Sequence, residues 1–78
     1  MNKWDFSEIR TLYDVQQILK MFNIYVYVGK RIWDIEMMAL ELDNLYNMHV
    51  ISKDVWLRSK LVLQREHRLE EDRNKGEL

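Results

Sequence analysis

The 78-residue chain contains no cysteine and no proline, and its only glycines are Gly29 and Gly76. Without cysteine it forms no disulfide and offers no thiolate to a metal ion, so apolar packing must hold the fold together. Since proline and glycine are the residues that most often interrupt helices, their scarcity favours long helices joined by short connections. Hydrophobic residues make up 47% of the chain, which is ample for a globular core and argues against intrinsic disorder.

The chain also lacks a strong net charge and a long apolar run. Lysine plus arginine number 12 and aspartate plus glutamate 13, so the formal net charge is −1 and gives no overall attraction to nucleic acid or to an anionic membrane. No apolar stretch approaches the roughly 20 residues that span a bilayer. The residues after Met1 are polar and aromatic, unlike the apolar region of a signal peptide. We therefore expect a cytoplasmic protein without a membrane partner, in which any attraction to a polyanion is local.

Apolar residues recur at helical spacing in three segments, which predicts an all-α fold, a compact three-helix bundle with short connections. The helices are expected at about 11–22, 30–47 and 53–69. Together they make one domain over 11–69, preceded by an N-terminal extension over 1–10 and followed by a charged tail over 70–78 that is expected to fray.

Polar residues at two of the expected helix starts are suited to capping. Thr11 and Asp14 have the spacing of a capping box, in which each side chain accepts a hydrogen bond from the other's backbone. Ser52 is a good N-cap for the third helix, and Asp54 places a negative charge in its first turn, where the helix dipole favours it.

The segment 24–28 is rich in β-branched and aromatic residues and ends at Gly29, a pattern typical of a strand. No second strand-like run exists elsewhere in the sequence, and a strand needs a partner. We therefore expect an extended connector that lies against the helices, with Gly29 permitting a turn into the second helix.

The second helix carries two apolar stripes on nearly opposite sides when successive residues are placed about 100° apart. The main stripe comprises Ile35, Met38, Leu42, Leu45 and Tyr46. The second comprises Trp33, Met37 and Leu40. We expect the connector or the N-terminal segment to cover the second stripe; if neither does, the stripe is a protein interface.

The third helix is basic away from its apolar side. From 52 to 68 there are five basic and two acidic residues, whereas 69 to 78 holds four acidic and two basic ones. The basic residues are Lys53, Arg58, Lys60, Arg65 and Arg68, and Leu57 and Leu61 lie among them. This distribution predicts a local positive field on the third helix, which the acidic tail weakens.

Residue patterns typical of catalysis or metal binding are missing. His49 and His67 are 18 residues apart and lack the companions of a metal site. Gly29 and Lys30 lack the rest of a phosphate-binding P-loop, and no serine has the context of a nucleophile. We expect a protein that is not an enzyme and that uses no metal and no cofactor.

The order and spacing of several short motifs resemble the YqgQ-like family of short cytosolic proteins from Bacillus and its relatives. The motifs are Tyr13-Asp14-Val15-Gln16-Gln17 with Leu19-Lys20, then Tyr27 and Gly29, then Asp34-Ile35-Glu36-Met37-Met38 with Glu41-Leu42 and Leu45-Tyr46, and finally Leu61-Val62-Leu63 with Arg65-Glu66. The resemblance covers most of the chain and implies a three-helix bundle. It also implies a suggested role in binding single-stranded nucleic acid, with residues up to Arg10 as an extension before the usual start.

Two binding hypotheses follow. In the first, the chain binds single-stranded nucleic acid, with cations on phosphates and tyrosines stacked on bases; the predicted residues are Lys30, Arg31, Arg58, Lys60, Arg65, Arg68, Tyr25 and Tyr27. The alternative for these residues is an ordinary solvated helix face with half-buried tyrosines. In the second hypothesis, the partner is another protein or a second copy of the chain, bound through Trp33, Met37, Leu40, Leu57 and Leu61. Recognition of duplex DNA by a helix-turn-helix ranks below single-strand binding, because the link before Ser52 lacks glycine and Asp54 would oppose the phosphates.

Overall fold

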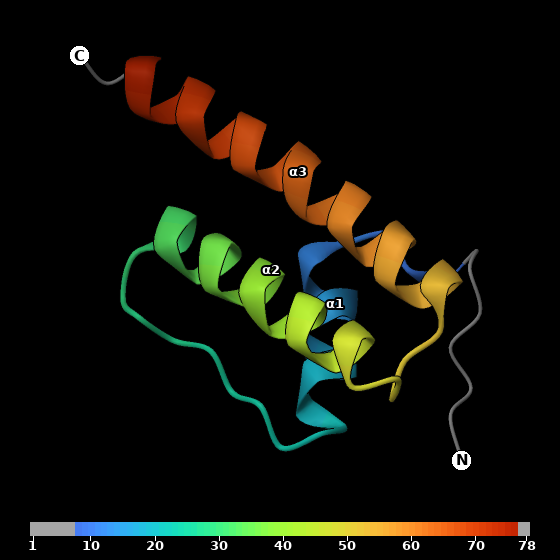
Figure 1. Cartoon of the computed structure of the whole chain (residues 1–78). Coiled ribbons are helices and arrows are strands. Elements are labelled where there is room, and N and C mark those ends of the chain that lie inside the picture. Colours follow the sequence, from blue (N-terminus) through green and yellow to red (C-terminus); the bar gives the residue numbers. More distant parts are fainter. Residues whose placement is uncertain (1–7, 77–78) are drawn as a thin grey trace.

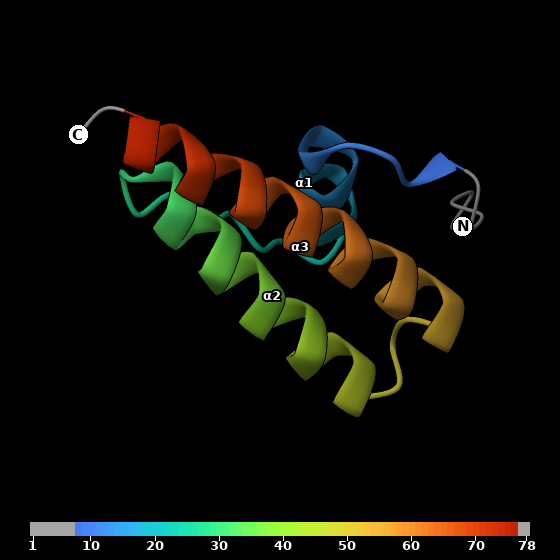
Figure 2. The same cartoon turned by 90° about the horizontal axis from the view of Figure 1, so that it is seen from above.

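The computed structural model describes residues 8–76, which form three α-helices. The helices are α1 (Leu12–Lys20), α2 (Arg31–Asn47) and α3 (Lys53–Gly76). Helices α2 and α3 lie side by side as a pair, and α1 crosses one side of that pair (Figures 1 and 2). The structure contains no strand within residues 8–76, so the predicted all-α three-helix bundle is confirmed.

The core lies where the three helices meet. It is built from the residues at helical spacing that the sequence marks as apolar: Leu12, Val15, Ile18 and Leu19 of α1, Ile35, Met38, Leu42 and Leu45 of α2, and Val55, Val62 and Leu63 of α3. Ile9 and Ile51, which precede α1 and α3, complete it. Each fully buried aliphatic side chain stabilises the fold by roughly 1.5–3 kcal/mol relative to exposure.

Both predicted N-terminal caps are confirmed. The Asp14 carboxylate accepts hydrogen bonds from the backbone N–H groups of Arg10 and Thr11, each at 3.0 Å, and the Thr11 hydroxyl accepts one from the Asp14 N–H at 3.2 Å. The bond from the Arg10 N–H, with those from Thr11, holds the pKa of Asp14 below its usual value. At α3, the Ser52 hydroxyl accepts a hydrogen bond from the Val55 N–H at 3.2 Å.

Two residues with positive φ end α1 and α2. Asn23 has φ of 63° and His49 has φ of 62°, values that asparagine and histidine adopt more readily than most residues. At each turn the next backbone N–H reaches back to a helix carbonyl, from Ile24 to Leu19 at 3.0 Å and from Val50 to Leu45 at 3.1 Å. This Schellman arrangement satisfies carbonyls left unpaired at a helix end, and it ends α1 before the predicted residue 22.

The connector between α1 and α2 has no regular secondary structure and follows a drawn-out path (Figure 1). Its side chains alternate: Ile24 and Val26 are half-buried against the core, whereas Tyr25 and Tyr27 are exposed. This alternation is what extended backbone produces. Gly29 has φ of 108°, so the extended connector and the turn at its glycine agree with the prediction.

The connector does not cover the second apolar stripe of α2, so that part of the prediction is wrong. Trp33, Met37 and Leu40 are 52%, 39% and 57% exposed. The connector packs on the other side of α2: Ile24 and Val26 pack against the core that includes Met38 and line a hollow with it. The half-buried side chains of an extended segment can cover only one strip of surface. The alternative cover, the N-terminal segment, falls largely on residues 1–7, outside the described residues.

Helix α3 continues to Gly76, beyond its predicted end at 69, so residues 70–76 of the predicted tail are helical. Glu70, of which the side chain is only 13% exposed, pairs with Arg31 of α2 and with Arg73 one turn later, both at 3.6 Å. Opposite charges three or four residues apart support a helix. At the other end, the predicted extension over 1–10 includes Ile9, which is fully buried in the core.

Candidate nucleic-acid interface

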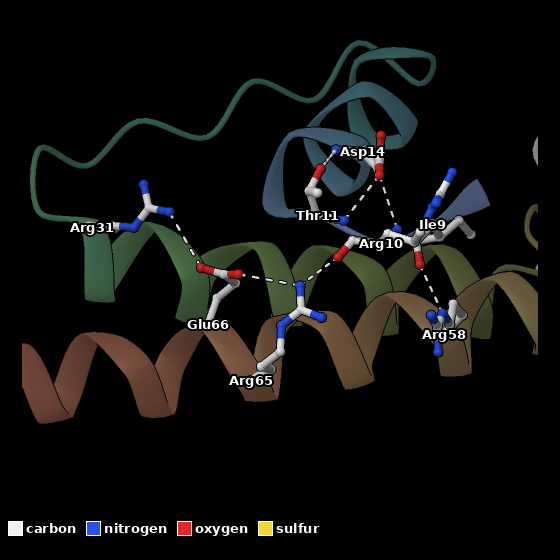
Figure 3. A network of polar contacts seen from close by, with 8 residues as sticks. All are labelled: Ile9, Arg10, Thr11, Asp14, Arg31, Arg58, Arg65 and Glu66. Carbon is white, nitrogen blue, oxygen red and sulfur yellow. Dashed lines mark hydrogen bonds and ion pairs between the residues drawn. The ribbon is translucent and has the colours of Figure 1, made fainter. Parts of the chain in front are cut away.

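Two of the predicted cations, Arg58 and Arg65, contact the segment that precedes α1 (Figure 3). The Arg58 Nε donates a hydrogen bond to the carbonyl of Ile9 at 2.8 Å. The Arg65 Nη2 donates one to the carbonyl of Arg10. Because Ile9 is buried between the helices, these guanidinium groups satisfy carbonyls that α1 cannot reach, and they hold the start of the domain on α3.

Lys60 belongs to a polar and aromatic cluster between α2 and α3. One carboxylate oxygen of Asp43 accepts hydrogen bonds from Lys60 Nζ at 2.7 Å and from Trp56 Nε1 at 2.8 Å. The bond from Lys60, followed by that from Trp56, lowers the pKa of Asp43. The Trp56 ring also stacks on Tyr46, with centroids 4.5 Å apart. Lys60 therefore helps to hold α2 and α3 together.

Arg31 links the start of α2 to the C-terminal half of α3. Its guanidinium lies 3.5 Å from Glu66 and 3.6 Å from Glu70. Glu66 also lies 3.4 Å from Arg65 (Figure 3). The Arg31 side chain is 49% exposed, so this partnership is screened by water and leaves part of the group accessible.

Lys30 and Arg68 are the predicted cations that the structure leaves exposed without an ion pair among the described residues. The Lys30 Nζ lies 5.2 Å from the ring centroid of Trp33, within the range of a cation–π contact. Arg68 is exposed on α3, one turn beyond Gln64. The field of a cation without a carboxylate partner is not offset by a nearby negative charge, so it can attract an anionic ligand.

The connector carries the predicted aromatic residues, and both are exposed, Tyr25 by 69% and Tyr27 by 87%. The alternative that they are half-buried packing residues is therefore wrong. Beside them, a hollow of about 250 Å³ opens between α1 and the connector, and its lining includes Gln16 and Lys20 of α1. Neither of these residues was among the predicted site residues, because their proximity to the connector depends on how the chain turns after α1.

The predicted protein-interface residues are also exposed but lie on two different helices. Leu57 and Leu61 of α3 are 41% and 46% exposed, while the stripe Trp33, Met37 and Leu40 belongs to α2. Neither set is covered by the described part of the chain, and whether either binds a partner stays a prediction.

Among residues 8–76 there is no group of three or more potential metal ligands. His67 instead pairs with carboxylates, its Nε2 lying 2.8 Å from Glu36 and its Nδ1 3.6 Å from Glu71. None of the helices in this part of the chain combines the length and apolar character needed to cross a bilayer.

These features define a small all-α protein with a tightly paired α2 and α3 and an exposed aromatic connector. The chain belongs to the YqgQ-like family, which it matches over residues 9–69. It is 47% identical over 66 residues to the uncharacterised protein YqgQ of Bacillus subtilis (strain 168), a match that covers 85% of this chain and 90% of that protein. The family predicted from the sequence motifs is thereby confirmed.

Proposed function

We propose that this protein binds single-stranded nucleic acid at a connector surface formed by Lys20, Tyr25, Tyr27 and Lys30. The observation that carries the proposal is the pair of tyrosines exposed by 69% and 87% on a drawn-out segment. Neighbouring exposed aromatic side chains can mark an interaction surface, and each ring offers a face on which a base can stack.

The spacing of the two tyrosines supports a single strand as the ligand. Tyr25 and Tyr27 are two residues apart, so their attachment points are separated by at most about 7 Å. This is roughly twice the ~3.4 Å rise per base in a stacked duplex strand. Rings at such a spacing suit bases that have been drawn apart, which a duplex does not offer.

The charges at the ends of the connector favour the same ligand. Lys20 ends α1 and Lys30 precedes α2, and both are exposed without an ion pair among the described residues. The nearby carboxylate of Asp34 already accepts a hydrogen bond from the Val28 N–H. Phosphates on either side of a stacked base would therefore meet positive charge. Arg68, which also has no ion pair among the described residues, adds positive charge on α3, whereas the charge of Arg31 is partly offset by Glu66 and Glu70. We place this activity in the cytoplasm.

Fluorescence-anisotropy titration of labelled single-stranded RNA and DNA across a salt series tests the proposal. Affinity is expected to fall as salt rises, because phosphate contacts release counterions. Tyr27→Ala should weaken binding by about 5- to 150-fold, the range expected for one base stacked on an aromatic ring, whereas Tyr27→Phe should retain it. Lys30→Gln should reduce the salt dependence by about one phosphate contact.

Lys53→Gln is the matched control, because Lys53 is also exposed at a helix start but belongs to α3, which begins at the opposite end of the pair from α2 (Figure 1). No binding by the wild-type protein at low salt would reject the function. Binding that is unchanged by Tyr27→Ala and Lys30→Gln would reject the connector surface while leaving the activity in place.

A second candidate function is self-association through the α2 stripe. Trp33, Met37 and Leu40 are exposed at helical spacing, and such a stripe can pack against the same stripe of another copy. Sedimentation equilibrium of the wild-type protein and of Trp33→Ala with Met37→Ala tests this candidate. A concentration-dependent dimer that the double variant loses would support it, and a monomer at all concentrations would reject it.

A further inference from the structure

The hollow between α1 and the connector combines an apolar floor with a polar rim. Its lining includes the apolar residues Leu19, Ile24, Val26 and Met38 and the polar or aromatic residues Gln16, Lys20, Tyr25 and Tyr27. Sites for small ligands are usually lined mainly by apolar side chains, with a few polar groups that orient the ligand.

The charge of this hollow distinguishes it from two others on the molecule. Its lining contains a lysine and no carboxylate. A second hollow includes Glu41. A third includes Glu36 together with Lys60, but that lysine is already bonded to Asp43 at 2.7 Å, and a carboxylate would repel a phosphate beside a bound ring. Of these three hollows, the one next to the connector therefore has the charge that best suits part of a polyanion.

Gln16 supplies a polar group that is available to a ligand. Its side chain is half-buried, and its amide makes no hydrogen bond within the described part of the chain. A glutamine amide carries both a donor and an acceptor. Every nucleobase presents donors and acceptors at its edge, and proteins read unpaired bases through such edges.

The size of the hollow limits what it can hold. Its volume of about 250 Å³ lies below the roughly 300–1,000 Å³ typical of pockets for drug-sized ligands. One planar ring system fits this limit better than a complete nucleotide, so the sugar and phosphate must remain outside, on the side of Lys20.

We propose that the hollow receives one unstacked base of the bound strand, with the Gln16 amide hydrogen-bonded to the edge of the base and Lys20 near the adjacent phosphate. This inference rests on the proposed single-strand binding and gives it a base subsite in addition to the stacking on Tyr25 and Tyr27. The remaining bases of the strand stay on the outer surface.

The experiment compares Gln16→Ala with Gln17→Ala, a neighbouring half-buried glutamine on α1 that does not line the hollow. Anisotropy is measured with a labelled oligothymidylate and with an abasic strand of equal length. Gln16→Ala should weaken binding of the oligothymidylate about 3- to 10-fold, as expected for one lost hydrogen bond, and leave binding of the abasic strand unchanged. Gln17→Ala should change neither.

Heteronuclear NMR provides a readout that does not depend on affinity. The side-chain amide signal of Gln16, assigned by its loss in Gln16→Ala, should shift when oligothymidylate is added, and the signal of Gln17 should not. The base subsite would be overturned if Gln16→Ala weakened binding of the oligothymidylate and of the abasic strand equally. It would also be overturned if the Gln16 signal did not move and Gln16→Ala bound with wild-type affinity. In either case Tyr27→Ala still tests the proposed function. Absence of any strand binding by the wild-type protein would reject both.

Discussion

The α2–α3 pair and the connector use the same kinds of residue in opposite ways. Between α2 and α3, Lys60 is bonded to Asp43 at 2.7 Å and Trp56 is stacked on Tyr46 at 4.5 Å. In the connector, Tyr25 and Tyr27 face solvent. A cation or an aromatic ring is therefore available to a ligand only where the fold has not already supplied its partner, and residue counts along a helix do not reveal this.

The largest contrast concerns two tryptophans. Trp56→Ala should lower the free energy of unfolding by about 2–4 kcal/mol, because it removes the stack on Tyr46 and the hydrogen bond to Asp43 from a half-buried position. Trp33→Ala, on the exposed stripe, should change it by no more than about 0.5 kcal/mol. Urea denaturation followed by circular dichroism measures both. Similar losses in the two variants would mean that Trp33 is packed as well as Trp56.

The next contrast concerns two arginines of α3. Arg58→Ala should cost about 1–2 kcal/mol of stability, because the carbonyl of the buried Ile9 loses a charged donor at 2.8 Å. Arg68→Ala, which removes a cation without an ion pair among the described residues, should stay within about 0.5 kcal/mol. The midpoint and slope of guanidinium unfolding give both values. An Arg58→Ala protein as stable as Arg68→Ala would show that the N-terminal contact contributes nothing.

Periodicity and capping residues were enough to predict the three helices, because the bundle buries the apolar positions that repeat at helical spacing. The basic face of α3 was harder to interpret. Arg58 and Arg65 contact the residues before α1, whereas Lys60 contacts α2, so the two flanks of one helix meet different elements. An angular count around a single helix contains no information about its neighbours.

The residues of the proposed base subsite were missed for a related reason. Gln16 is separated from Tyr25 in sequence by the end of α1, and the two line one hollow after the chain turns at Asn23, which adopts a φ of 63°. Asparagine tolerates this conformation without requiring it. The alternation in the connector was the signal that could be read in advance, since it places Ile24 and Val26 inward and the tyrosines outward.

A smaller contrast distinguishes the turn that opens the connector from the turn that precedes α3. His49→Gly should raise stability by about 0.5–1 kcal/mol, because glycine adopts a φ of 62° without a Cβ penalty. Asn23→Gly should gain only a few tenths of a kcal/mol, because asparagine adopts this conformation more easily than other residues. Thermal unfolding of the two variants provides the comparison. A destabilised His49→Gly protein would show that the imidazole makes a compensating contact.

The smallest expected effect is a pH dependence between α2 and α3. The hydrogen bond to Glu36, together with the charge of Glu71, raises the pKa of His67. Because the pKa of His67 is higher in the folded than in the unfolded state, protonation of His67 stabilises the fold. This stabilisation is complete below about pH 6.5, the pKa of an unperturbed histidine, and is lost as the pH rises through the pKa of His67 in the folded protein. Because both partners are partly exposed, a few tenths of a kcal/mol is expected.

Urea unfolding at about pH 6 and pH 8.5 measures this effect, and His67→Gln is the control because it retains a polar side chain that does not titrate. The wild-type protein should be more stable at the lower pH by that margin, and the margin should vanish in the variant. Asp14 and Asp43 do not affect this comparison. Their pKa values are lowered, so the stability that their carboxylates contribute is lost only in acid, at pH values well below about 6. Parallel pH profiles for the two proteins would show that His67 does not link α3 to α2. The charged contacts that distinguish the helix pair from the connector would then be those of Lys60, Asp43 and Arg31.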